Sequence, residues 1–171
     1  TGDIASSVNS NPLIRENTVL SRSFSKMYGG GGNWDIGGWD TSNVTDMSNM
    51  FNGAISFDKN IGGWVTSKVT DMEGMFAGAI KFDQNIGEWD TSKVTNMNKM
   101  FQFAIKFDQN IGEWDTSMVG MIGMYYMFQN ASSFDKDLSG WCVTNITSEP
   151  YKFYENSSIP LLSLPVWGTC P

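Results

Sequence analysis

The 171-residue chain contains no histidine. This absence removes the most common general base and the Ser-His and Cys-His nucleophile pairs. No paired acid motif stands outside the repeated part of the sequence, so no single acid and base can be assigned. We therefore predict that the protein is not an enzyme, although carboxylates from two different columns of the repeat could still meet at the surface and support glycoside hydrolysis.

Cysteine is almost as scarce, with only Cys142 and Cys170. Two thiolates are too few for a structural zinc site, and we predict no metal centre built on them. Their position near one end of the chain favours a single disulfide, which forms in an oxidising compartment. The alternative is that both are unpaired buried thiols.

Positive charge is also scarce, because 11 basic residues stand against 18 acidic ones and give a net charge of −7. The basic residues form no run, so the chain lacks the clustered charge that nucleic acid binding requires. No apolar run approaches the roughly 20 residues that cross a bilayer, and no signal sequence follows Thr1. We expect a monomeric fragment of a mature protein that does not itself span a membrane.

What the sequence does contain is a repeat of 25 residues. Cassettes beginning at Trp39, Trp64 and Trp89 read WDTSNVTDMSNMFNGAISFDKNIGG, WVTSKVTDMEGMFAGAIKFDQNIGE and WDTSKVTNMNKMFQFAIKFDQNIGE. Trp114 follows after 25 residues and Trp141 after 27, because the segment VGMIGMYYMF carries two extra residues. Self-similarity at such a period is the signature of a solenoid.

Apolar residues recur at the same place in each copy and predict a core that runs along the solenoid. The columns are Val44, Val69, Val94 and Val119; Met47, Met72 and Met97; Met50, Met75, Met100 and Met127; Phe51, Phe76, Phe101 and Phe128; Ala54, Ala79, Ala104 and Ala131; Phe57, Phe82, Phe107 and Phe134; and Ile61, Ile86, Ile111 and Leu138. A methionine stripe could instead line a promiscuous binding groove, but beside Phe and Ala it is more often core.

Each repeat is predicted to hold one short helix and one short strand. Met47, Met50 and Ala54 have the i, i+3, i+7 spacing of one helix face. The segment 85–90 fits a very short strand that pairs in parallel with the next coil. The predicted fold class is an α/β solenoid of about five coils with a capped C-terminus.

Segments of different composition flank the repeats. Residues 1–18 are polar and non-repetitive and are interpreted as a flank or cap. Residues 19–141 form the predicted solenoid, beginning with a degenerate copy around Tyr28. Residues 142–171 become Pro-rich and apolar and are predicted to form a C-terminal cap closed by the disulfide.

Two outward columns are candidate binding sites: Asp58, Asp83, Asp108 and Asp135, and Thr41, Thr66, Thr91 and Thr116. Stacked carboxylates repel unless water screens them or a cation bridges them, so calcium is an alternative to solvated turn carboxylates. The threonine hydroxyls either satisfy local backbone groups or form an ice-binding array. A third column varies from copy to copy, which is where specificity can be tuned: Ser48, Glu73, Asn98 and Lys99.

The string WDTSNVTDMSNMFNGAISFDKNIGGW resembles the repeats of BspA-like leucine-rich-repeat surface proteins of bacteria, over roughly residues 20–141. The ending PVWGTCP resembles the segment that closes such arrays in some members. The resemblance implies a right-handed LRR-like solenoid in a secreted or cell-surface protein, with no catalytic residues and no cofactor. We expect a non-enzymatic extracellular binding or adhesion module that presents polar ladders to a protein or glycan. A structural spacer, and a calcium- or ice-binding array, are the alternatives.

Overall fold

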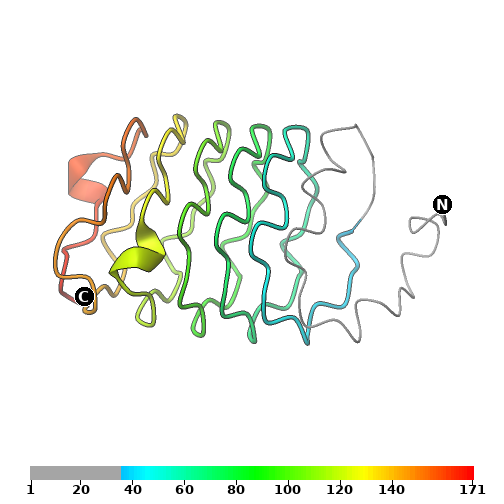
Figure 1. The fold of residues 1–171 in the computed structure, drawn as a ribbon, viewed down its shortest axis with the longest axis horizontal. Helices are drawn as coiled ribbons and strands as arrows, with labels where there is room; N and C mark the ends of the chain where they lie inside the picture. Colours follow the sequence, from blue (N-terminus) through cyan, green and yellow to red (C-terminus); the bar gives the residue numbers. More distant parts are fainter. Residues whose placement is uncertain (1–35) are drawn as a thin grey trace.

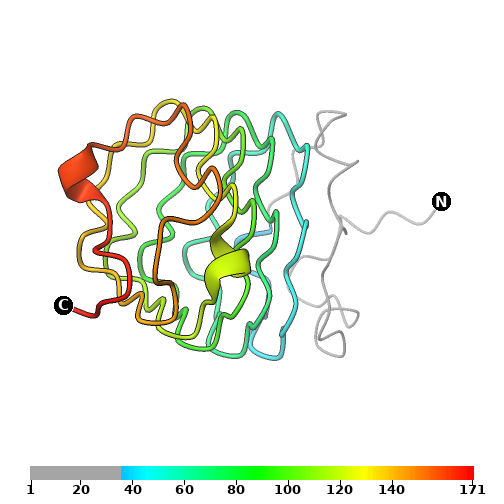
Figure 2. The same ribbon diagram turned by 60° about the vertical axis from the view of Figure 1, so that its left-hand side comes forward.

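A computed structural model describes residues 36–171, which form a stack of coils (Figure 1). Each coil lies beside the next along the long axis, and the C-terminal tail closes one end (Figure 2). The expectations for residues 1–18 and for the degenerate copy around Tyr28 lie outside the described residues. The stack confirms the solenoid that the repeat predicts.

The described residues contain little regular secondary structure. The named elements are two short 3-10 helices, η2 (Met121–Met124) and η3 (Leu161–Ser163), drawn as coiled ribbons in Figure 1. Two isolated parallel bridges, Asp46 with Asp71 and Asp71 with Asn96, join neighbouring coils. The prediction of one α-helix and one strand in each repeat is therefore wrong. No helix in the described part of the chain is long and apolar enough to cross a membrane.

Tight turns replace the predicted helix. The Met50 N–H donates to the Met47 carbonyl (3.3 Å), whereas the Asn49 N–H donates to the Glu73 carbonyl of the next coil (2.6 Å). Because alternate amides leave their own coil, the i→i−4 bonds of an α-helix cannot form. Asn49 has φ 55°, the left-handed value required at the third position of such a turn.

Left-handed residues recur at two positions in each described coil. The first position is occupied by Asn49, Gly74, Lys99, Tyr126 and Lys152, and the second by Gly53, Gly78, Phe103, Asn130 and Asn156. Several of these residues are not glycine, and the following coil stabilises their left-handed backbone. In all but the last coil, their N–H groups donate to carbonyl oxygens of the coil that follows.

The segment predicted as a strand is also a turn. The Asn85 Oδ1 accepts the Gly87 N–H (3.0 Å), and the Trp89 N–H donates to the carbonyl three residues earlier (3.2 Å). A Cβ atom on Gly87 would lie 2.5 Å from the Asn110 carbonyl oxygen of the next coil. The coils therefore approach one another here more closely than a side chain allows.

The apolar columns fill the interior and confirm the predicted core. Every residue of the valine, methionine, phenylalanine, alanine and isoleucine columns is buried. Phenylalanine rings stack within a coil, Phe51 on Phe57 at 3.8 Å, and between coils, Phe51 on Phe76 at 5.7 Å. Each such buried side chain contributes about 1.5 to 3 kcal/mol relative to an exposed one. The methionine stripe belongs to this core and lines no groove.

The stack continues beyond Trp141, the last tryptophan of the repeat. The Phe128 N–H donates to the Phe153 carbonyl (2.8 Å), as the amides of earlier coils donate to the coil that follows. A disulfide joins Cys142 and Cys170 at the beginning and end of this last coil and confirms the predicted pairing. The Trp167 ring packs edge-on against Phe153 (5.3 Å) and covers the interior. The division into flank, solenoid and cap stays a prediction.

Candidate functional site

The aspartate column lies along the outside of the stack, where the first three carboxylates are bonded to the next coil. The Asp58 Oδ1 accepts the Asp83 N–H (3.1 Å), and the Asp83 Oδ1 accepts the Asp108 N–H (3.0 Å). The series ends at Asp108, whose Oδ1 accepts the Asp135 N–H (3.2 Å). Main-chain donors of the following coil therefore stabilise the negative charges.

Side-chain donors contact the same carboxylates. The Gln109 Nε2 donates to Asp83 (2.8 Å), and the same contact occurs one coil earlier. The Lys136 Nζ lies 2.7 Å from Asp108 and 2.7 Å from Asp135. The hydrogen bond from Lys136 lowers the pKa of Asp135, while the bonds to both carboxylates raise the pKa of Lys136. No group of three or more Asp, Glu or Cys side chains among residues 36–171 is placed to hold a metal ion.

The threonine column is buried. Its hydroxyls donate to carbonyls of the next coil, from Thr41 to Val65 (3.0 Å) and from Thr116 to Cys142 (2.8 Å). The outward position expected for this column is therefore wrong, since all four residues are at most 2% exposed: Thr41, Thr66, Thr91 and Thr116. These hydroxyls join adjacent coils. Because they are buried, they do not form the flat surface that an ice-binding array needs.

The column that varies from copy to copy lies at the surface, half-buried except for buried Gly74 and exposed Tyr151, and changes its character along the stack. We name it the variable face; it comprises the first left-handed residue of each coil and the residue before it: Ser48, Asn49, Glu73, Gly74, Asn98, Lys99, Tyr125, Tyr126, Tyr151 and Lys152. Main-chain bonds between coils fix its register, as in the bond from the Tyr126 N–H to the Tyr151 carbonyl (3.0 Å). The face is polar in the first coils and aromatic and cationic in the last two.

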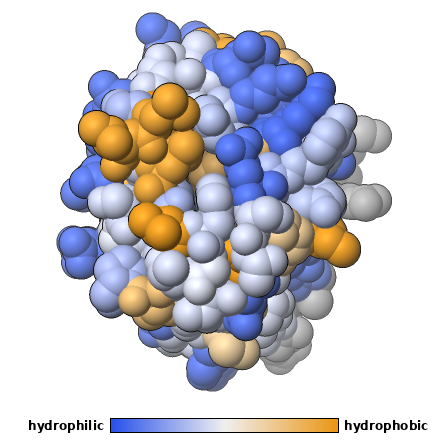
Figure 3. All heavy atoms as spheres, turned by 90° about the vertical axis from the view of Figure 1, so that its left-hand side faces the viewer, coloured by the Kyte–Doolittle hydropathy of each residue, from blue (hydrophilic) through white to orange (hydrophobic). Residues whose placement is uncertain are grey.

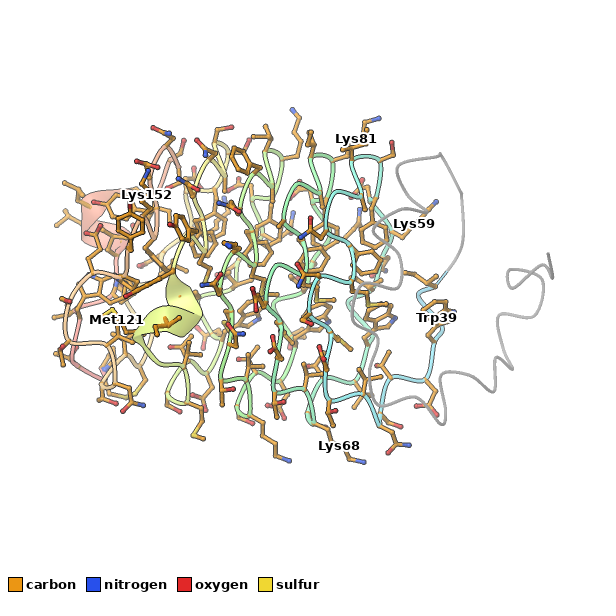
Figure 4. All side chains as sticks on the ribbon, viewed as in Figure 1. Trp39, Lys59, Lys68, Lys81, Met121 and Lys152 are labelled. Carbon is orange, nitrogen blue, oxygen red and sulfur yellow. A yellow bond between two sulfur atoms is a disulfide. The ribbon has the colours of Figure 1, made fainter. Side chains whose placement is uncertain are left out.

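Three tyrosines and two lysines meet at the C-terminal end of the variable face, and we name them the tyrosine cluster. The Tyr126 and Tyr151 rings meet edge-on at 5.3 Å, and Tyr125 contacts Tyr151 at 6.3 Å. The Lys99 Nζ lies 5.6 Å from the centre of the Tyr126 ring, and the Lys152 Nζ lies 5.8 Å from that of Tyr151. Lys152 is labelled toward this end of the molecule in Figure 4.

The two extra residues of the fourth coil add apolar surface directly before the cluster. The segment that contains them includes η2, in which Ile122 is 69% exposed, and Met118 nearby is 57% exposed. The Asn98 Nδ2 donates to the Ile122 carbonyl (3.0 Å) and ties the insertion to the preceding coil. Met121 packs against the core from the same element (Figure 4). The irregular step in the period therefore coincides with exposed apolar and aromatic residues.

Sequence reasoning identified the variable column from Ser48 to Lys99 but not its continuation. Met127 stands in the column of Met100, so Tyr125 and Tyr126 correspond to Asn98 and Lys99, but the predicted column ends at Lys99 and does not extend to them. The signal that could have found the cluster is this adjacent pair within VGMIGMYYMF, with Tyr151 one coil further on. Aromatic residues contribute much of the binding energy at protein interfaces. Their presence in an outward, variable column therefore indicates a binding surface.

Comparison with known proteins identifies a family but no individual protein similar to this chain. No curated protein matches the chain, and no solved structure matches it. A family model described as "Mycoplasma protein of unknown function, DUF285" matches residues 18–122 and again residues 84–163. Two overlapping matches are expected where one model meets tandem copies of a repeat. Because together they cover far more than half of the sequence, the chain belongs to the DUF285 family.

Proposed function

We propose that this chain is a non-enzymatic extracellular binding module that contacts a protein or glycan partner through the variable face, with the tyrosine cluster at its centre. The observation that carries the proposal is the position of the cluster. It lies where the repeat gains two residues, and its tyrosine rings belong to none of the buried apolar columns. Tyrosine offers a large, rigid and amphipathic contact area at small entropic cost, which suits a binding surface.

The charge of the cluster supports a partner with acidic groups. Lys99 and Lys152 lie over tyrosine rings; Lys152 also pairs with Glu155 (3.2 Å), so the Lys99 cation is the group that would attract an acidic partner. Cations held against aromatic rings present a charge and an apolar surface together. A carboxylate or sulfate on a protein or glycan would meet both.

The disulfide supports an extracellular location. A bond between Cys142 and Cys170 persists in an oxidising compartment and is reduced in most cytosols. The resemblance of the cassettes to BspA-like surface repeats points the same way. The family description names no enzyme, and the chain has no histidine, which supports a binding role over a catalytic one.

A structural spacer is the second candidate. It is favoured by the continuity of the stack, in which phenylalanine and tryptophan rings, threonine hydroxyls and aspartate carboxylates link successive coils. Such an array would hold other domains apart without contacting a ligand of its own. The aspartate bonds described above give no support to a calcium array.

The experiment is a binding screen of the purified chain on arrays of extracellular proteins and glycans. We expect saturable binding that falls at least tenfold in the double variant Tyr126→Ala, Tyr151→Ala. The matched control is Ile55→Ala, which trims an exposed apolar side chain of the first described coil. Absence of saturable binding on both arrays would favour the spacer. Binding that survives the double variant would remove the tyrosine cluster from the proposal.

A further inference from the structure

Hydrogen bonds between coils run in one direction over the turns that bear the variable face. Amides at alternate residues of one coil donate to carbonyls of the next, as in Tyr126 to Tyr151 (3.0 Å) and Phe128 to Phe153 (2.8 Å). The same pattern joins each pair of described coils that precedes them. Each coil therefore offers a row of donors on the side that faces the C-terminal end of the stack.

The last coil offers the same donors to solvent. Lys152, Tyr154 and Asn156 occupy the donor positions, and their N–H groups donate to no carbonyl within residues 36–171. The left-handed φ values of Lys152 (51°) and Asn156 (59°) match those of the preceding coil, so the backbone has the same shape. Pro150 takes the first donor position and has no N–H, which limits the row to three.

Apolar side chains are exposed at the same end of the molecule. Leu161 is 73% exposed, Leu162 is 95% exposed and Val166 is 65% exposed. Viewed from that end, Figure 3 shows hydrophobic side chains beside a polar area. The end coil of a solenoid is expected to have a polar outer face, and this one departs from that rule. The interior itself is covered by Trp167, so a ligand here would bind to the rim.

We propose that this end of the stack, termed the C-terminal edge and defined by the N–H groups of Lys152, Tyr154 and Asn156, binds a peptide segment of a partner protein that follows the turned path of a repeat coil. The edge presents donors alone, so its ligand must present carbonyl oxygens at alternate residues along the same turned path, as residues 71–77 do toward the preceding coil. Two copies of this edge cannot pair with each other, because each lacks the acceptors. Apolar side chains of the peptide would cover Leu161 and Leu162.

The edge shares Lys152 with the variable face but uses its main-chain N–H and not its side chain, so either proposal can fail alone. The probe for the edge is a synthetic peptide of sequence TDMEGMFAGA, the segment that supplies carbonyls to the preceding coil within the stack. The control is a scrambled peptide of the same composition. The measurement is amide hydrogen exchange of the whole chain, resolved by residue with NMR.

In the free protein we expect fast exchange at Lys152, Tyr154 and Asn156, and slow exchange at Tyr126 and Phe128, whose amides are bonded. Saturating probe should slow the three edge amides at least fivefold, and the scrambled peptide should not. Unchanged edge amides, or equal slowing by both peptides, would overturn the proposal.

A substitution at the apolar part of the edge provides a second test. Leu162→Glu should leave the melting temperature unchanged, because the side chain is 95% exposed, and should weaken probe binding at least threefold. Unchanged probe affinity would overturn the role of the leucines. The same variant should bind array partners of the variable face as the parent does, which separates the two proposals.

Discussion

The indole N–H of Trp89 donates to the carbonyl oxygen of Ile61 in the preceding coil, at 3.2 Å. The same oxygen accepts the main-chain N–H of Trp64 (3.1 Å), so it closes a turn in its own coil and holds the next coil as well. A carbonyl oxygen has two lone pairs, and here both are used. The indole bond recurs at Trp64 with Ile36, Trp114 with Ile86 and Trp141 with Ile111.

Replacing Trp89 by phenylalanine removes this buried bond. We expect Trp89→Phe to lower the free energy of unfolding by about 1 to 2 kcal/mol, measured by urea denaturation followed by fluorescence. The control is Trp167→Phe, because the Trp167 indole donates to no residue of the described chain. An equal loss in both variants would show that ring size rather than the hydrogen bond is responsible.

The threonine column can be tested with two residues of one coil. Thr91→Val removes a buried hydroxyl bond to the Asp115 carbonyl (3.0 Å) and should lower the free energy of unfolding by about 1 kcal/mol. Thr95→Val removes an exposed bond to the Thr70 carbonyl (3.1 Å) and should have a smaller effect, since water can replace it. A larger loss at Thr95 would contradict the linking role given to the buried column.

Close approach of neighbouring coils is tested at two glycines. Gly87→Ala places a Cβ atom 2.5 Å from a main-chain oxygen of the next coil and should destabilise the fold by about 1 to 3 kcal/mol. Gly63→Ala is the control, because nothing lies within 4 Å of its Cβ position. Equal melting temperatures for the two variants would mean that the coils are spaced more widely than described.

The disulfide closes a loop with a sequence separation of 28 residues. Its loss should lower the free energy of unfolding by about 3 to 4 kcal/mol in the chain-entropy model. The measurement is urea denaturation of the double variant Cys142→Ser, Cys170→Ser beside the parent with and without reductant. Parent curves that do not respond to reductant, together with a stable double variant, would show that the bond contributes little.

Acid should destabilise the folded chain. Hydrogen bonds from Lys136 lower the pKa of Asp135, those from Ser92 lower that of Asp90, and that from Gln129 lowers that of Glu155. A carboxyl group whose pKa is lowered in the folded state stabilises the fold at pH values above its ordinary pKa, here 3.8 for the aspartates. This contribution is lost as the pH falls through the pKa of the folded state. We therefore expect stability to fall below about pH 4. In Lys136→Met the fall should be shallower, and identical acid curves would contradict this origin.

The sequence alone was sufficient to predict the solenoid, its core and the disulfide. A period of 25 residues requires one coil per period, and residues such as Phe51 and Phe57 are apolar in every copy because they stack on their equivalents. Two cysteines separated by one coil length lie close together when the coil closes, as Cys142 and Cys170 do.

Local structure could not be predicted, because turns and helices share the same apolar spacing. Met47, Met50 and Phe51 lie on one face of a helix and also on the inner side of two successive turns. The choice between them depends on bonds to the next coil, which no local pattern reveals. Left-handed backbone at Lys99 and Phe103 was unpredictable for the same reason, since neither residue favours it alone.

The disulfide has a mechanical consequence, because it converts the last coil into a covalent ring. A force applied between the two ends of the chain passes through the bond, and the residues between Cys142 and Cys170 carry none of it. Extension under load would therefore stop short by the length of that segment, roughly 90 Å for 28 residues at full extension. Reduction would release this hidden length, so the reach of the unfolded chain depends on the redox state around it.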